Sequence, residues 1–284
     1  MPLRLSAGTA ILLSMMLPPL LSAPPIPAET STGKAWGLLE TAVQSKRSSA
    51  RVAGVRVLGL VPDNANARKL AESALEDPKP EVRIAGASAL GQMHAAASAP
   101  LLEKLTSDKQ MSVALAAAHA LYLLKNPSGY EMYFAVLTGQ RKNGQGLIAE
   151  QMQILRDPSK MAMLGLEQGI GYVPFAGIGW DALRAIMKKD PSPARAVAAS
   201  ILAQDADPAT ANALVDATQD KNWIVRVAAV DAIARRGDPT LEAKVEPLLD
   251  DGKPQVRYTA AAAVLRLTAI AEARKRSKKK PAVP

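Results

Sequence analysis

The sequence repeats itself with a period of 31 residues, and this period restricts the possible folds more than any other feature. The clearest copies are PEVRIAGASALG (80–91), WIVRVAAVDAIA (223–234) and PQVRYTAAAAVL (254–265). Each copy joins a Val-Arg pair to a run of small and aliphatic residues, and the segments between the copies repeat as well. A fixed period with two helical patterns in each unit predicts stacked helical hairpins, in which each hairpin packs against its neighbours.

The apolar residues within one copy fall on a single side of a helix. Val82, Ala85 and Ala89 are spaced i, i+3 and i+7, which is the pattern of an amphipathic helix. Hydrophobic residues make up 48% of the chain but aromatic residues only 4%, so Ala, Leu, Val and Ile carry the apolar surface. Alanine favours helices, whereas a sheet sandwich needs more β-branched and aromatic residues. We therefore expect an all-α fold of about seven hairpins, whose second helices begin near residues 51, 82, 113, 145, 194, 225 and 255.

An acidic residue precedes five of these second helices by four or five positions, at Asp77, Asp108, Asp190, Asp220 and Asp251. The resulting pattern, D-x(4)-V-R-x-A-A-x-x-A-L, resembles HEAT repeats over roughly residues 35–272. It is similar in particular to the Ala-rich bacterial repeats of phycobilisome-lyase-like proteins. The resemblance implies a right-handed α-α superhelix, a HEAT-type solenoid, in which the recurrent Asp and Arg meet across successive turns. It also implies protein binding more often than catalysis.

The N-terminal segment, residues 1–28, has the three parts of a secretory signal peptide. Arg4 supplies a positive start, residues 9–22 form a Pro-broken apolar run, and small residues follow at Ala23 and Ala28. This arrangement predicts cleavage and export to the periplasm or the exterior, with an uncleaved anchor as the alternative. The solenoid is expected over residues 29–272.

Most of the excess positive charge lies at the C-terminus. The formal net charge of +9 falls to +2 when Arg4 and six C-terminal residues are set aside, namely Arg274, Lys275, Arg276, Lys278, Lys279 and Lys280. We expect residues 273–284 to form a disordered basic tail, either a solubilising end or a contact for an anionic envelope surface. The tail lacks interleaved aromatic residues, which argues against nucleic acid as the partner.

The period breaks down in an irregular insertion at about residues 139–180. Here GIGWDA (177–182) has the G-x-G-x-x-A spacing of a dinucleotide-binding turn. Such a turn must follow a strand inside a βαβ unit and needs an acidic residue about 20 positions later, and this chain has neither. We therefore expect no nucleotide and no other cofactor. Tyr172, Phe175 and Trp180 are instead predicted to form an adhesive surface, with a small satellite core as the alternative.

One polar column on the second helices is expected to face the groove of the solenoid. Its members and the residues one turn later are Arg56, His119, Asp231, Gln92, Gln204, Arg235 and Arg266. We predict that this column contacts a partner, with ordinary solvated helix surface as the alternative.

The residue inventory limits the chemistry of the chain. It has no cysteine and two histidines, which excludes disulfides, Cys-ligated metals, thiol nucleophiles and three-His metal sites. We nominate no catalytic residue and no metal ligand. The predicted function is an exported, non-enzymatic scaffold that binds a protein or peptide through its groove and central insertion. The alternatives are a lyase-like enzyme or enzyme accessory using His119 with Asp231 or another nearby carboxylate, and an electrostatic binder of envelope polymers through the tail.

Overall fold

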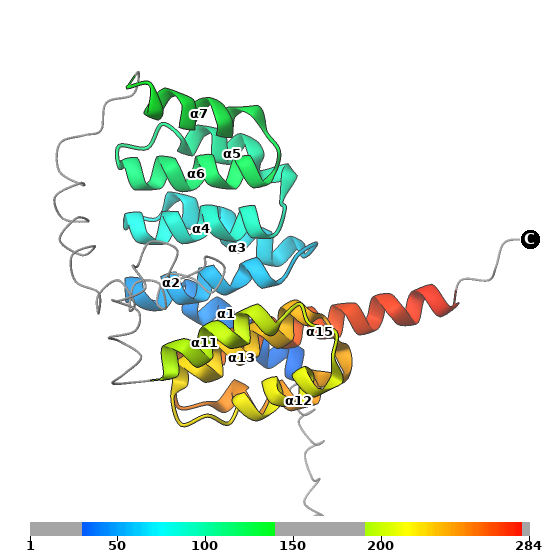
Figure 1. Cartoon of the computed structure of the whole chain (residues 1–284). Coiled ribbons are helices and arrows are strands. Elements are labelled where there is room, and N and C mark those ends of the chain that lie inside the picture. Colours follow the sequence, from blue (N-terminus) through cyan, green and yellow to red (C-terminus); the bar gives the residue numbers. More distant parts are fainter. Residues whose placement is uncertain (1–29, 140–190, 280–284) are drawn as a thin grey trace, which may run out of the picture.

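Helical hairpins form all of the regular structure in the part of the chain that the computed structural model describes, residues 30–139 and 191–279 (Figure 1). The first group comprises α1 (Ser31–Val43), α2 (Ser48–Val57), α3 (Ala65–Ser73), α4 (Pro80–Gln92), α5 (Ala99–Leu105), α6 (Met111–Leu123) and α7 (Pro127–Leu137). The second comprises α11 (Ser192–Leu202), α12 (Pro208–Ala217), α13 (Trp223–Arg236), α14 (Glu242–Val245) and α15 (Pro254–Lys279). Short 3-10 turns are η1 (Leu58–Leu60), η2 (Ala74–Glu76), η3 (Ala96–Ser98), η4 (Pro239–Leu241) and η5 (Glu246–Asp250).

The predicted starts of the second helices are confirmed wherever the structure describes them. Helices α2, α4, α6, α11, α13 and α15 all begin within three residues of the expected positions, and the start near residue 145 lies outside the described residues. Local chemistry fixes these boundaries. The Asn222 side chain caps α13 by accepting the Ile224 backbone N–H, and Gly237 ends that helix in the left-handed conformation, with φ of 67°.

Small residues let neighbouring helices pack closely in the core. A Cβ added at Gly91 would lie 2.9 Å from the Cα of Ala120, so the backbones of α4 and α6 touch there. Leu90, Leu121 and Ile233 are fully buried between such helices. Each contributes about 1.5–3 kcal/mol of burial free energy, as the repeat pattern predicts for the apolar side of each hairpin.

An Arg–Asp ladder joins successive hairpins, as the resemblance implies. Arg51 forms a bidentate pair with Asp77, at 2.7 Å from Nε to Oδ2 and 2.9 Å from Nη2 to Oδ1. Both side chains are mostly buried, and hydrogen bonding from Arg51 lowers the pKa of the Asp77 carboxyl. Equivalent pairs are Arg83–Asp108, Arg195–Asp220 and Arg226–Asp251.

Three of the ladder arginines also hold the turn that precedes their own helix. The Nη1 of Arg51, Arg83 and Arg226 donates to the carbonyl oxygen six residues earlier, at 2.8–2.9 Å. The ladder aspartates accept a backbone N–H two residues later, as Asp77 does from Lys79 at 2.8 Å. One Arg and one Asp in each unit therefore fix both the turn and its distance from the next hairpin.

The hairpins do not stack in the order of the sequence. Helix α15, the last of the chain, packs against α1 and α2, the first two (Figure 1). Lys34 Nζ lies 2.6 Å from both carboxylate oxygens of Asp250, and the Ser31 hydroxyl hydrogen-bonds to Glu246. We call this contact of α15 with α1, α2 and η1 the seam. The spatial order of the second helices is therefore α11, α13, α15, α2, α4 and α6, followed by α7.

The expected start of the disordered C-terminal tail at residue 273 is wrong, because α15 extends beyond it. The sequence predicts a disordered tail from residue 273, but α15 continues through Lys279. Alanine, glutamate, arginine and lysine are all good helix formers, and the Arg276–Glu272 pair at 3.1 Å adds i,i+4 support. Residues 280–284 lie outside the described residues.

Two other predictions also fall on residues that the structure does not describe. These are the signal peptide at residues 1–28 and nearly all of the insertion at 139–180. Among the described helices, none combines the length and apolar character needed to cross a membrane.

Candidate functional site

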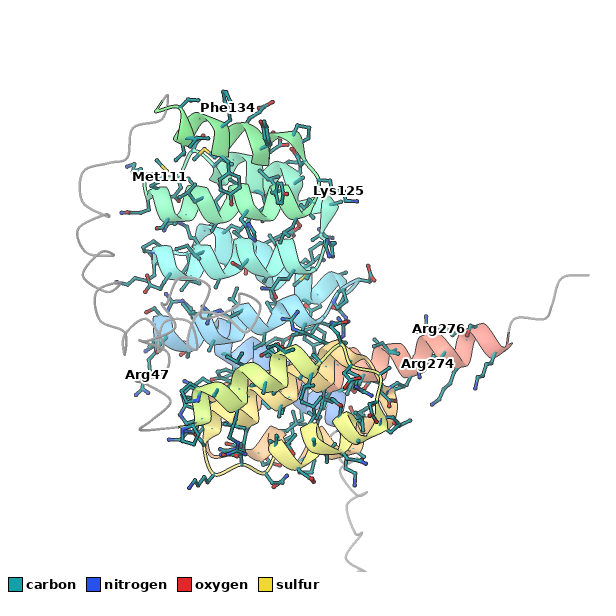
Figure 2. All side chains as sticks on the ribbon, viewed as in Figure 1. Arg47, Met111, Lys125, Phe134, Arg274 and Arg276 are labelled. Atoms are coloured by element: carbon teal, nitrogen blue, oxygen red, sulfur yellow. The ribbon has the colours of Figure 1, made fainter. Side chains whose placement is uncertain are left out.

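The outer face of α7, together with the end of α6, exposes a group of large apolar side chains. The exposed fractions are 59% for Tyr122, 65% for Tyr130, 49% for Phe134 and 85% for Leu137. The rings of Tyr130 and Phe134 are stacked, with centroids 6.3 Å apart and planes inclined by 25°. We call these four residues the aromatic end surface, because α7 is the last described helix at this end of the array (Figures 1 and 2).

Helix α7 has two apolar sides, and only one of them is covered. Its inner side buries Gly129 and Met132 against α6. A Cβ on Gly129 would lie 2.6 Å from the backbone nitrogen of Tyr122, so glycine is required for this close contact. Tyr130, Phe134 and Leu137 follow i, i+4, i+7 spacing on the outer side. Within the described part of the chain, no further helix packs on that side.

An open hollow of about 480 Å³ adjoins the aromatic end surface. It is lined by Tyr122, Leu123, Lys125, Asn126, Pro127 and Tyr130. Asn126 is held firmly, because its Nδ2 donates to Glu103 Oε1 at 2.9 Å and its Oδ1 accepts the Ser128 N–H at 3.0 Å. Lys125 has a positive φ of 57° where the chain turns from α6 into α7. The hollow thus combines two tyrosine rings and a proline with a single cation at Lys125.

The predicted groove column is only partly exposed. Arg56, Gln92 and His119 are half-buried, and Gln204 is exposed. Gln92 lies against Gly59, where an added Cβ would meet its Oε1 at 2.6 Å.

The expectation of a solvent-facing position is wrong at Asp231, which is 4% exposed. Asp231 belongs to a charged cluster beside the seam. Its carboxylate pairs with Arg235 at 2.7 Å from Oδ2 to Nε, and Arg266 Nη1 donates to the carbonyl of Leu60 in η1 at 3.1 Å. Burial raises the pKa of Asp231, opposed by Arg235, and burial together with Arg235 lowers the pKa of Arg266. Three predicted groove residues, Asp231, Arg235 and Arg266, therefore lie beside the contact between the two halves of the molecule.

The two residues named for the lyase-like alternative, His119 and Asp231, are not brought together. His119 is on α6 and Asp231 is on α13, and the stacking order places α15, α2 and α4 between these helices (Figure 1). In the described residues, no group of three or more His, Asp or Glu side chains is placed to hold a metal ion. Tyr172, Phe175 and Trp180 lie outside the described residues, so their predicted role stays a prediction.

The aromatic end surface is not among the sites expected from the sequence, although a signal for it exists. In the α7 segment PSGYEMYFAVL, Met132 and Val136 mark one apolar side, while Tyr130, Phe134 and Leu137 mark another. A helix with two apolar sides must lie inside a stack or present one side to a partner.

A family model described as HEAT repeats matches residues 37–128 and 180–266. No curated protein sequence matches the chain. Among solved structures, human deoxyhypusine hydroxylase in complex with glycerol is 18% identical, covers 84% of this chain and 85% of its own, and has a TM-score of 0.31. The complex of CpcE and CpcF of phycocyanin lyase from Nostoc sp. PCC7120 is 16% identical, covers 89% of this chain and 99% of its own, and has a TM-score of 0.33. An engineered protein is 14% identical, with coverages of 83% and 97% and a TM-score of 0.28.

Proposed function

Because this chain belongs to the HEAT-repeat family, we propose that it is a non-enzymatic scaffold that binds a protein or peptide partner through the aromatic end surface. The observation that carries the proposal is the exposed apolar side of α7. Terminal repeats of a solenoid normally present a polar outer face to water. Here Leu137 is 85% exposed and Tyr130 is 65% exposed at the end of the array.

The composition of this surface suits a protein partner. Tyrosine and other aromatic residues are enriched at protein interfaces, because they combine large apolar area with few rotatable bonds. The adjoining hollow has tyrosines on its walls and Lys125 as its only charged side chain. This lining fits an extended peptide segment with apolar side chains, since aromatic-lined grooves commonly bind such segments. We propose two further contact regions from the sequence alone, the central insertion and the groove column without Asp231.

The charged side chains support a binding role over a catalytic one. Asp231 is paired with Arg235 beside the seam, and Arg266 holds the Leu60 carbonyl. The Arg266 hydrogen bond joins the two halves of the molecule, and the Asp231–Arg235 pair lies within α13 beside that contact. The open hollow, in turn, is lined by residues that include no carboxylate and no histidine.

Site-specific crosslinking tests the scaffold proposal. A photoreactive amino acid is placed at Tyr130, in the aromatic end surface, or at Ile201, which is 70% exposed on α11. Irradiation in an extract of the source cells should give a discrete crosslinked protein from position 130 and not from position 201. The double substitution Tyr130→Ser and Phe134→Ser should lower capture of that protein at least tenfold, with an unchanged thermal unfolding midpoint. Equal crosslinking at both positions, or undiminished capture by the double variant, would contradict the proposal.

We also propose that the scaffold works outside the cytoplasm, on the basis of the signal-like pattern of residues 1–28. Fractionation of cells that express the chain with and without these residues tests this. The full chain should be found in the envelope or the medium, and the shortened chain in the cytoplasm. An identical distribution of the two would contradict export.

A further inference from the structure

The C-terminal end of α15 leaves the body of the molecule and projects from it as a free helix (Figure 1). Up to Leu267 the helix is held in the core, and Thr268 still bonds to Glu242 at 2.8 Å. From Glu272 to Lys278 every residue is exposed. We call residues 272–279 the arm. The labelled side chains of Arg274 and Arg276 extend from this part of the helix (Figure 2).

The arm carries positive charge over about half of its circumference. Its basic residues are Arg274, Lys275, Arg276, Lys278 and Lys279, and Glu272 is its single acid. At about 100° per residue, the positions of Arg274, Lys275, Arg276 and Lys278 span roughly 200° of the helix circumference, and Ala273 and Ser277 lie in the remaining sector. The uncharged positions are Ala273 and Ser277, so the arm has no apolar side.

We propose that the arm binds a flexible, linear polyanion whose closely spaced anionic groups contact it over about half of its circumference. A flat anionic membrane would meet only one side, and helices that lie on membranes bury an apolar face that the arm lacks. A flexible chain can instead follow the charges around the helix and release its condensed counterions. The helix holds its cations in a fixed array, so less ordering is needed when the polymer binds.

This interaction goes beyond the scaffold function and is physically separate from it. The arm extends from α15 at the middle of the array, whereas the aromatic end surface lies on α7 at one end (Figure 1). A polyanion on the arm and a protein on α7 can therefore be bound at the same time. The two proposals can fail independently.

The test compares two variants with the same loss of charge. In the arm variant, Arg274, Lys275, Arg276 and Lys278 are replaced by Gln, which keeps helix propensity. In the control variant, four exposed lysines of the body, Lys69, Lys79, Lys109 and Lys221, are replaced by Gln. The full chain and both variants are titrated with fluorescent long-chain polyphosphate, with poly-L-glutamate of similar length, and with phosphatidylserine-containing vesicles.

We expect the full chain to bind polymer, the arm variant to bind at least tenfold more weakly, and the control to change less than threefold. The salt dependence should weaken in the arm variant by roughly 0.7 units of log K per log salt for each cation removed. Polyphosphate and polyglutamate distinguish a phosphate-bearing from a carboxylate-bearing ligand. Equal losses in the two variants, binding to vesicles but to neither polymer, or no polymer binding would each overturn the proposal. Thermal unfolding verifies that both variants remain folded.

Discussion

The seam and the aromatic end surface are two boundaries of helical stacks. The first is buried by other helices of the chain, and the second is exposed to solvent. At the seam, α15 is covered by α1 and α2, and its residues Ala260, Ala261, Ala262 and Ala263 are completely buried. At the other boundary, α7 presents Tyr130, Phe134 and Leu137 to solvent. A hairpin in a solenoid has two sides to cover. The chain covers one boundary with its own first helices and, in our proposal, leaves the other to a partner.

The strongest test of this contrast is the same truncation at both places. Leu267→Ala on α15 removes a side chain that is 0% exposed and should cost about 2–5 kcal/mol of unfolding free energy. Leu137→Ala on α7, where the side chain is 85% exposed, should change it by less than about 0.5 kcal/mol. Chemical denaturation followed by far-UV circular dichroism measures both values. Similar losses would mean that α7 is as deeply packed as α15.

An intermediate effect is expected when one step of the ladder is removed. Asp77→Ser deletes the carboxylate that Arg51 holds at 2.7 and 2.9 Å, at a cost of about 1.5–3 kcal/mol at neutral pH. The serine hydroxyl can still cap the turn, as Ser45 does when it accepts the Arg47 N–H at 3.2 Å. The loss therefore reports mainly on the ion pair.

This effect should depend on pH in a defined direction. The folded-state pKa of Asp77 is lowered, so its contribution is complete above its unfolded-state pKa, at about 3.9. It is lost as the pH falls through the lower folded-state pKa. The difference in unfolding free energy between wild type and Asp77→Ser should therefore be constant near neutrality and shrink below about pH 4. A difference that does not change with pH would assign the loss to packing.

The smallest predicted effect is a gain in folding stability at the seam, where one Arg–Asp pair of the ladder is missing. Arg257 on α15 donates to the Asp251 carbonyl at 2.7 Å, yet within the described residues it has no carboxylate partner of the kind that Arg51 has. In the spatially next hairpin, Ser45 occupies the aspartate position, since its carbonyl accepts from Arg51 Nη1 at 2.9 Å. Ser45→Asp should stabilise the fold by about 0.5–1 kcal/mol.

A double-mutant cycle decides the origin of that gain. Introducing Ser45→Asp into an Arg257→Gln background should abolish the stabilisation if the new carboxylate completes the ladder. If the gain persists without Arg257, it comes from the nearby Lys46 and Arg47. That outcome would contradict the register that we assign across the seam.

The hairpin boundaries could be predicted from the sequence because they are encoded locally. Val82, Ala85 and Ala89 specify one face of a helix wherever it lies in the array, and Asp77 specifies the turn before it. The spatial order could not be predicted, because successive hairpins present similar Ala- and Leu-rich sides. Nothing in this repeat distinguishes a seventh hairpin that ends the stack from one that packs on the first.

The same similarity explains the errors at individual sites. Asp231 occupies a position that is half-buried at His119, but it is nearly inaccessible because it lies beside the seam. Tyr130 and Phe134 were recognisable as unusual, but their exposure depends on α7 being the last described helix of its stack. The burial of Asp231 and the exposure of Tyr130 and Phe134 both depend on where each hairpin lies in the array, and the repeat pattern does not specify that position.

The contacts of η5 and α15 with α1 also affect folding during synthesis, because they join residues that are made far apart in time. Ser31 and Lys34 leave the ribosome early, whereas their partners Glu246 and Asp250 are made more than 200 residues later. The outer side of the first hairpin therefore remains exposed to solvent until η5 and α15 have been translated. Contacts of such long range are slow to form and leave apolar surface open in the meantime. The nascent chain is therefore most exposed to aggregation, and most dependent on chaperones, until its final helix emerges.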